Sequence, residues 1–125
     1  MADELKISIA EFSFTKGGAT VRANTREQTI DISGANAIHN IQNVGTSAED
    51  LVLGDVAATG WMWFRNLSNT TCEIGTDLED AQGFYSFADV HAGEEQMFRA
   101  PAGIGKIQAQ FVSTPGVLEY IMIDP

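Results

Sequence analysis

Cysteine, histidine and proline are scarce in this 125-residue sequence, which has one cysteine, two histidines and three prolines. Because Cys72 is the only cysteine, an intrachain disulfide is excluded. The first residues, Met1 to Lys6, lack a basic segment followed by an apolar one, so we expect no signal peptide. No apolar run approaches the length of a transmembrane helix. These absences predict a soluble protein made in a cytosol.

Basic residues are also few, with 7 Lys and Arg against 17 Asp and Glu and a formal net charge of -10. This charge repels phosphate backbones, so we expect no nucleic-acid partner. It disfavours an anionic membrane surface for the same reason, and we expect no membrane partner. The length is that of one domain, and we assign residues 1–125 to a single domain.

Short alternating segments separated by turn residues run along the whole chain, and no long amphipathic helix is indicated. Turn signals recur roughly every eight to twelve residues, which is typical of a sandwich or barrel. The sequence therefore predicts an all-β fold, an antiparallel β-sandwich that is jelly-roll-like. The expected strands include residues 5–9, 19–23, 28–32, 36–44, 83–87, 95–100, 106–112 and 117–123.

The N-terminal part, residues 1–34, has two interpretations that the sequence leaves open. It forms either an extended arm or edge strands of the sandwich. The alternation changes phase near Ala10 and Glu11, which predicts a β-bulge. Lys16, Gly17 and Gly18 predict a turn.

Residues 60–75, which read GWMWFRNLSNTTCEIG, form the densest apolar stretch. We interpret them as a β-hairpin at the centre of the sandwich, with strands at residues 61–64 and 71–74. Such a dense apolar stretch must be covered on both faces, by this chain or by a second one.

Trp61 and Trp63 fall on one face of their expected strand, with Arg65 two positions further on. If exposed, this row is an aromatic platform for a sugar or a protein partner. The simpler interpretation is that the tryptophans fill the core or cover a sheet. Alternation does not say which face is inward, because Met62 and Phe64 are apolar too. We take Trp61, Trp63 and Arg65 as interface candidates.

The C-terminal strand, residues 117–123, has apolar side chains on both faces. An edge strand exposed on one face normally carries polar residues there. We therefore expect this strand to lie inside a sheet or against another copy of the chain. Ile121 and Ile123 are further interface candidates, and the pattern predicts a homo-oligomer.

No group of residues indicates a reaction. Cys72, His39 and His91 lack the local motifs of a cysteine–histidine nucleophile, and Cys72 is better explained as a small buried residue. Asp77, Glu79 and Asp80 lack the spacing of a calcium loop, and a solvated loop explains them better than a metal site or a hydrolase centre. We expect no catalytic, cofactor or metal site, and we expect that the chain is not an enzyme.

Several short motifs occur along residues 38–124. They are TGWMWFRNL at 59–67, CEIG at 72–75, Ala-Gly-Glu at 92–94, Arg-Ala-Pro at 99–101 and Leu-Glu-Tyr-Ile at 118–121. Together these motifs resemble small structural proteins of tailed bacteriophages. The resemblance covers roughly residues 38–124, and the N-terminal third departs from it.

This resemblance implies a β-rich, non-enzymatic component of the virion, synthesised in the cytoplasm of a host bacterium. The function it implies first is that of a capsid decoration or cement protein, which binds the major capsid protein and stabilises the assembled shell. The resemblance to decoration proteins also implies a homotrimer. Two alternatives remain: an accessory protein of the phage tail or neck that binds another virion protein, and a carbohydrate-binding β-sandwich that uses Trp61 and Trp63.

Overall fold

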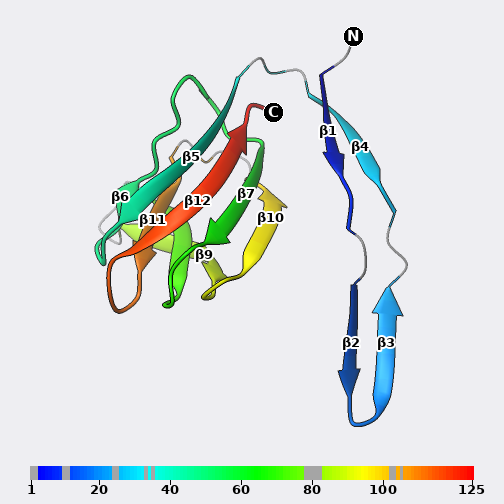
Figure 1. Ribbon diagram of the computed structural model, residues 1–125. Helices are drawn as coiled ribbons and strands as arrows, with labels where there is room; N and C mark the ends of the chain where they lie inside the picture. Colours follow the sequence, from blue (N-terminus) through cyan, green and yellow to red (C-terminus); the bar gives the residue numbers. More distant parts are fainter. Residues whose placement is uncertain are drawn as a thin grey trace. The chain divides into compact units, whose positions relative to one another are not determined.

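The computed structural model describes residues 3–9, 12–23, 26–32, 34, 36–77, 83–101, 104 and 106–125 of the chain. Over these residues the chain forms twelve β-strands and no helix, as the alternating pattern predicts (Figure 1). The chain divides into two compact units, Met1–Ser33 and Gly34–Pro125. We call the first unit the ribbon and the second the sandwich.

The sandwich consists of two antiparallel four-stranded sheets that face each other (Figure 1). The first sheet has the order β10-β7-β12-β5, and the second has the order β6-β11-β8-β9. The strands of the first sheet are β10 (Glu95–Arg99), β7 (Trp61–Asn66), β12 (Gly116–Ile123) and β5 (Ala37–Val44). Those of the second sheet are β6 (Glu49–Asp50), β11 (Gln108–Phe111), β8 (Cys72–Asp77) and β9 (Phe84–Val90).

The pairing of these eight strands is nested. The first strand of the sandwich pairs with the last, β5 with β12, and the next pairs inward are β6 with β11, β7 with β10 and β8 with β9. Successive pairs alternate between the two sheets, which is the arrangement of an eight-stranded jelly roll. The predicted jelly-roll-like β-sandwich is therefore confirmed.

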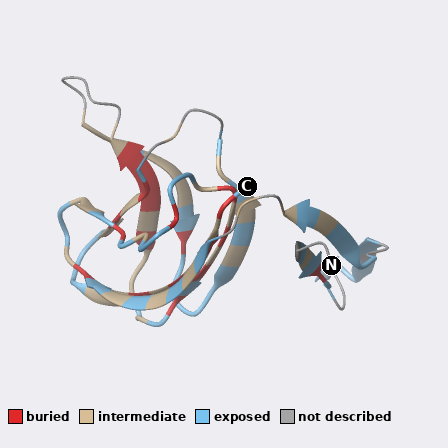
Figure 2. Ribbon diagram, turned by 90° about the horizontal axis from the view of Figure 1, so that it is seen from above, coloured by how far each residue is buried: buried red, intermediate tan, exposed pale blue. Residues whose placement is uncertain are grey.

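The core lies between the two sheets and follows the period of two expected of half-buried strands. Along β12, Leu118, Tyr120 and Met122 are fully buried, whereas the residues between them are half-buried. Burial is therefore concentrated in the sandwich strands (Figure 2). The core residues are Val44, Leu51, Val56, Met62, Phe64, Cys72, Ile74, Val90, Ile107, Ala109, Phe111, Leu118, Tyr120 and Met122.

The prediction of a β-hairpin at residues 60–75 is wrong. β7 pairs with β10 and β12 in one sheet, and β8 pairs with β9 and β11 in the other. The connection between them crosses from sheet to sheet instead of folding back. The buried Asn66 side chain holds this crossing, donating from Nδ2 to the Thr70 and Val90 carbonyls at 2.6 and 2.9 Å and accepting from the Ser68 amide at 2.9 Å. The turn residues that predicted a hairpin therefore connect one sheet to the other instead.

The C-terminal strand lies inside a sheet, as its apolar faces predict. β12 has β7 on one side and β5 on the other, and it pairs with β5 along its whole length. Its inward side chains fill the core, and Ile121 and Ile123 lie on the outward face.

The ribbon contains two antiparallel strand pairs. β1 (Asp3–Ile7) pairs with β4 (Gln28–Ile32), and β2 (Phe12–Lys16) pairs with β3 (Ala19–Ala23). Gly17 and Gly18 connect β2 to β3 with φ angles of 60° and 81°, the left-handed values that a two-residue type I′ turn requires. The predicted turn is confirmed, and the bulge expected at Ala10 and Glu11 lies outside the described residues.

Candidate interaction face

The two faces of β7 have different environments. Met62 and Phe64 are at most 1% exposed and point into the core, whereas Trp61 and Trp63 are half-buried on the outside of the first sheet. The interpretation that the tryptophans cover a sheet is therefore the one that the structure supports. The sequence left the choice open because both faces of this strand are apolar.

All five interface candidates lie on this outward face. Trp61, Trp63 and Arg65 come from β7, and Ile121 and Ile123 come from the neighbouring strand β12, where Ile121 is directly opposite Trp63. Outward residues of β10 and β5 extend the surface on both sides. We call this surface the tryptophan face; its members are Trp61, Trp63, Arg65, Glu95, Met97, Arg99, Glu119, Ile121, Ile123, His39 and Ile41.

An apolar row crosses the tryptophan face. The strand register places Met97, Trp63 and Ile121 side by side on β10, β7 and β12. Met97 is 37% exposed. Cross-strand neighbours on one face contact each other directly, so Met97, Trp63 and Ile121 form a continuous apolar row. The row meets His39 on β5, and the exposed Ile41 lies opposite Glu119, outside it.

A charged row lies next to the apolar one. Arg65 donates from Nε to Glu95 Oε1 at 2.6 Å and from Nη1 to Glu119 Oε1 at 3.3 Å. The hydrogen bond to Glu95 is the main cause that raises the Arg65 pKa, and the charges of Glu95 and Glu119 add to it. His39 Nε2 lies 2.7 Å from Glu119 Oε2, so the ring has a hydrogen-bond partner.

Both indole rings have a guanidinium group over them. The Arg65 Cζ atom lies 5.0 Å from the Trp63 ring centroid, and the Arg99 Cζ atom lies 5.7 Å from the Trp61 ring centroid. These are cation–π distances. Because a bound sugar ring would need the same face of the indole, the guanidinium groups would have to move before either tryptophan could act as a stacking platform there.

Met97 and Arg99 belong to the tryptophan face but were missed as candidates. The signal was present in the alternation of residues 95–99, where Glu95, Met97 and Arg99 share one face. Their contact with the tryptophans depends on β10 pairing with β7, more than thirty residues away in sequence, and local pattern does not predict such a partner.

The residues considered for nucleophilic chemistry have structural environments. Cys72 is 0% exposed on a core strand, which confirms its interpretation as a small buried residue. Burial raises the Cys72 pKa to about 12, with Glu73 adding to the effect, so the reactive thiolate is suppressed at neutral pH. His91 follows β9 in a loop, and its Nδ1 lies 3.1 Å from Thr71 Oγ1.

The acidic segment at residues 77–80 is only partly described. Asp77 ends β8, and Glu79 and Asp80 lie outside the described residues. Among the residues that the structure places, no group of three or more His, Cys, Asp and Glu side chains is arranged to hold a metal ion. Within the same residues, no helix is long and apolar enough to cross a membrane.

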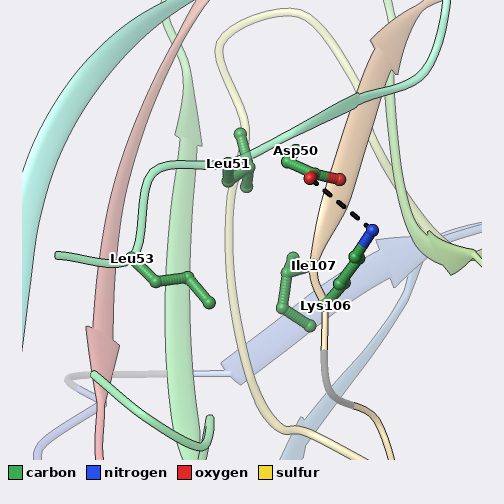
Figure 3. Close-up of a pocket in the computed structure, with 5 residues that line it drawn as sticks. All are labelled: Asp50, Leu51, Leu53, Lys106 and Ile107. Atoms are coloured by element: carbon green, nitrogen blue, oxygen red, sulfur yellow. Dashed lines mark ion pairs between the residues drawn. The ribbon is translucent and has the colours of Figure 1, made fainter. Parts of the chain in front are cut away.

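A small pocket of about 190 Å³ opens beside β6, lined by Asp50, Leu51, Leu53, Lys106 and Ile107 (Figure 3). Its two charges face each other, with Lys106 Nζ 3.8 Å from Asp50 Oδ2. Asp50 Oδ1 also accepts a hydrogen bond from Gln108 Nε2 at 2.8 Å. The pocket is smaller than the roughly 300 Å³ at which ligand sites begin, and its polar groups are already paired.

Comparison of the chain with protein-family models, with curated proteins and with solved structures found no match.

Proposed function

We propose that the chain is a non-enzymatic structural protein of a phage virion, and specifically a capsid decoration protein that binds the assembled shell. The observation that supports this most is the tryptophan face, an aromatic and aliphatic surface on the outside of a paired sheet. Protein interfaces are enriched in tryptophan, methionine and arginine, and all three occur there. The motifs that resemble phage structural proteins supply the virion assignment.

The fold adds support by analogy. Jelly rolls recur in viral capsid and lectin domains, but one fold hosts many functions, so the topology alone does not assign one. The acidic composition suits a protein that is made in many copies in a bacterial cytoplasm and stays soluble there.

The proposed mechanism is mass action on the assembled shell. A protein that binds across the joints between capsid subunits adds buried interface that exists only in the closed shell. Anything that binds one state and not the other stabilises the bound state. A symmetric oligomer, for which we propose a trimer, engages several subunits at once and gains avidity.

Immunogold labelling of the virions tests the assignment. Antibodies against this chain should label the heads in negative stain, and pre-incubation with purified protein should remove the label. Label restricted to the tail or neck would replace the decoration protein with the tail or neck alternative. Virions that carry no label would refute both.

A second experiment tests the mechanism. Purified protein is added to shells of the same phage that lack it, and the temperature at which the shells open is recorded. We expect the unmodified chain to raise that temperature. The exposed Tyr85, on the second sheet, provides a matched control: Tyr85→Ser should retain the effect and Trp63→Ser should lose it. Equal protection by both variants would remove the tryptophan face from the proposal.

A carbohydrate-binding module is the second candidate, because two tryptophans lie outward on one sheet of a fold that also occurs in lectins. Acrylamide quenching of tryptophan fluorescence separates the two candidates. Sugars that bind by stacking on Trp61 and Trp63 should protect the fluorescence from quenching. Quenching that sugars leave unchanged would rule the platform out.

A further inference from the structure

Among the ribbon residues whose burial the structure describes, almost none is buried. Of these residues, only Ile7 is buried, at 7% exposure, and most of the others are exposed (Figure 2). Each of the two sheets of the ribbon has only two strands. A two-stranded hairpin is marginally stable at best in water, since it buries too little apolar surface to offset the entropy of ordering it. The ribbon therefore needs a partner surface to be stable.

One face of the ribbon is suited to such a partner. In the β1–β4 pair, Leu5 is directly opposite Ile30, and alternation puts Ile7 and Ile32 on the same face. Leu5, Ile30 and Ile32 are half-buried, whereas Glu4, Lys6, Thr29 and Asp31 on the other face are exposed. The pair is thus amphipathic, with an aliphatic face on which Leu5, Ile30 and Ile32 remain partly exposed.

We propose that the ribbon of one copy packs this aliphatic face on the tryptophan face of a second copy, so that the chain oligomerises by exchanging its ribbons. This proposal goes beyond the proposed function and does not depend on the phage assignment. It names the partner of the tryptophan face as the ribbon of another copy, so Trp63 would support binding to the shell by holding the oligomer together and not by contacting the shell itself.

The dimensions of the two surfaces agree. Five-residue strands such as β1 and β4 extend about 17 Å, and four strands spaced by about 4.8 Å make a sheet close to 20 Å wide. The β1–β4 pair therefore fits on the first sheet as an added layer. In that layer Leu5 and Ile30 would pack on the apolar row of the tryptophan face.

The net charges of the two units favour a contact of the tryptophan face with the ribbon of a second copy over a contact with the sandwich of that copy. The sandwich carries twelve acidic and three basic residues, a net charge of -9, whereas the ribbon carries five acidic and four basic residues, a net charge of -1. A contact between two sandwiches brings two strongly negative bodies together. A ribbon on a sandwich avoids this, and residues 12–26 of the ribbon carry Lys16, Arg22 and Arg26 without an acidic residue.

Stoichiometry selects a second copy over an unrelated protein. Every chain has one aliphatic ribbon face and one tryptophan face, so exchange covers both in a one-to-one ratio. When one surface of a copy contacts a different surface of the next copy, the assembly closes into a ring if the rotation between copies allows it. Such a ring is compatible with a trimer.

Sedimentation with matched variants tests the exchange. An interface with a Kd of about 1 µM would be largely assembled at about 10 µM, where we expect the unmodified chain to be an oligomer. Ile30→Asp and Trp63→Ser should each raise the dissociation concentration about tenfold or more. The controls are Thr29→Asp, on the opposite face of the same ribbon strand, and Tyr85→Ser, on the other sheet.

Fluorescence gives a second readout, because Trp61 and Trp63 are the two tryptophans of the chain. Emission should move to longer wavelength on dilution as the ribbon leaves the tryptophan face, and Ile30→Asp should show the shifted emission at every concentration. A monomer at about 10 µM, or an oligomer that neither Ile30→Asp nor Trp63→Ser weakens, would overturn the proposal.

Mixed single-cysteine variants decide whether the contact joins two copies. Ile30→Cys protein and tagged Ile121→Cys protein are oxidised separately and together. A disulfide-linked species containing one chain of each kind is expected only in the mixture, and the buried Cys72 should not take part. Failure to form this species would overturn the exchange, whatever the labelling of virions shows.

Discussion

The buried Cys72 thiol makes folding stability depend on alkaline pH. Its pKa rises from 9.0 to about 12 because the core strand removes the thiol from water, with the Glu73 charge as the second cause. The folded state therefore keeps a proton that the unfolded state loses. The stability from this difference is fully present below pH 9 and is lost as the pH rises toward 12.

We predict that the urea midpoint falls steadily between pH 9 and pH 12, and that Cys72→Ala weakens this dependence. Some dependence should remain, because burial also raises the Tyr120 pKa, with the same sign. Urea unfolding followed by circular dichroism at several pH values measures both slopes. Identical slopes for the two proteins would contradict the assigned pKa.

A second residue-scale prediction concerns Gly75, at the irregularity where the β8–β9 register shifts. A Cβ atom there would lie 2.0 Å from the Tyr85 carbonyl oxygen, so a side chain cannot fit without moving the backbone. Gly75→Ala should lower the free energy of unfolding by about 3 kcal/mol. Gly45→Ala is the control, because its added Cβ has no neighbour nearer than 3.7 Å. Equal urea midpoints for the two variants would refute the prediction.

At the scale of elements, the crossing between the two sheets depends on Asn66. Its side chain makes three hydrogen bonds, and its removal would leave the Thr70 and Val90 carbonyls and the Ser68 amide without these partners. Asn66→Ala should lower the free energy of unfolding by about 3 kcal/mol. Asn69→Ala, an exposed position in the same connection, should cost less than about 0.5 kcal/mol. Thermal unfolding of both variants checks this, and a small effect at Asn66 would mean that other residues hold the crossing.

Period-two alternation predicted most individual strands of the sandwich correctly. β5, β10 and β12 lie close to their expected positions because each alternates between a buried and an outward face. This signal is local: it reports which residues share a face within one strand. The fold class followed from it because a series of such strands separated by turns has few possible architectures.

Pairing between strands was less predictable, and the connection from β7 to β8 shows why. Turn residues between two apolar strands fit a hairpin and an inter-sheet crossing equally well. What distinguishes them is the hydrogen bond from Asn66 Nδ2 to Val90, 24 residues away. The tryptophan face had the same limitation, since its candidates were identified singly and only the register between β7 and β12 brings them together.

At the scale of the whole molecule, the nested pairing joins the start of the sandwich to its end. β5 and β12 pair over eight positions, and they form the outermost pair, which encloses the other three pairs in sequence. Contacts so distant in sequence form late and slowly, because the loop between the strands must close first. The sandwich is therefore expected to fold as one cooperative unit that needs its last strand.

Among the described residues, the buried core cluster lies within the sandwich, between Val44 and Met122. We predict that a fragment of residues 34–125 folds by itself and melts within about 5 °C of the full chain measured as a monomer, because a loss of 1 kcal/mol shifts the melting temperature of a domain of this size by about that much. Calorimetry at low concentration gives the melting temperature.

In sedimentation the fragment should remain monomeric at concentrations where the full chain assembles, since it keeps the tryptophan face and lacks the ribbon. A fragment that fails to fold would show that the ribbon stabilises the sandwich within one copy, and a folded fragment that still assembles would show that sandwich surfaces alone hold the oligomer together.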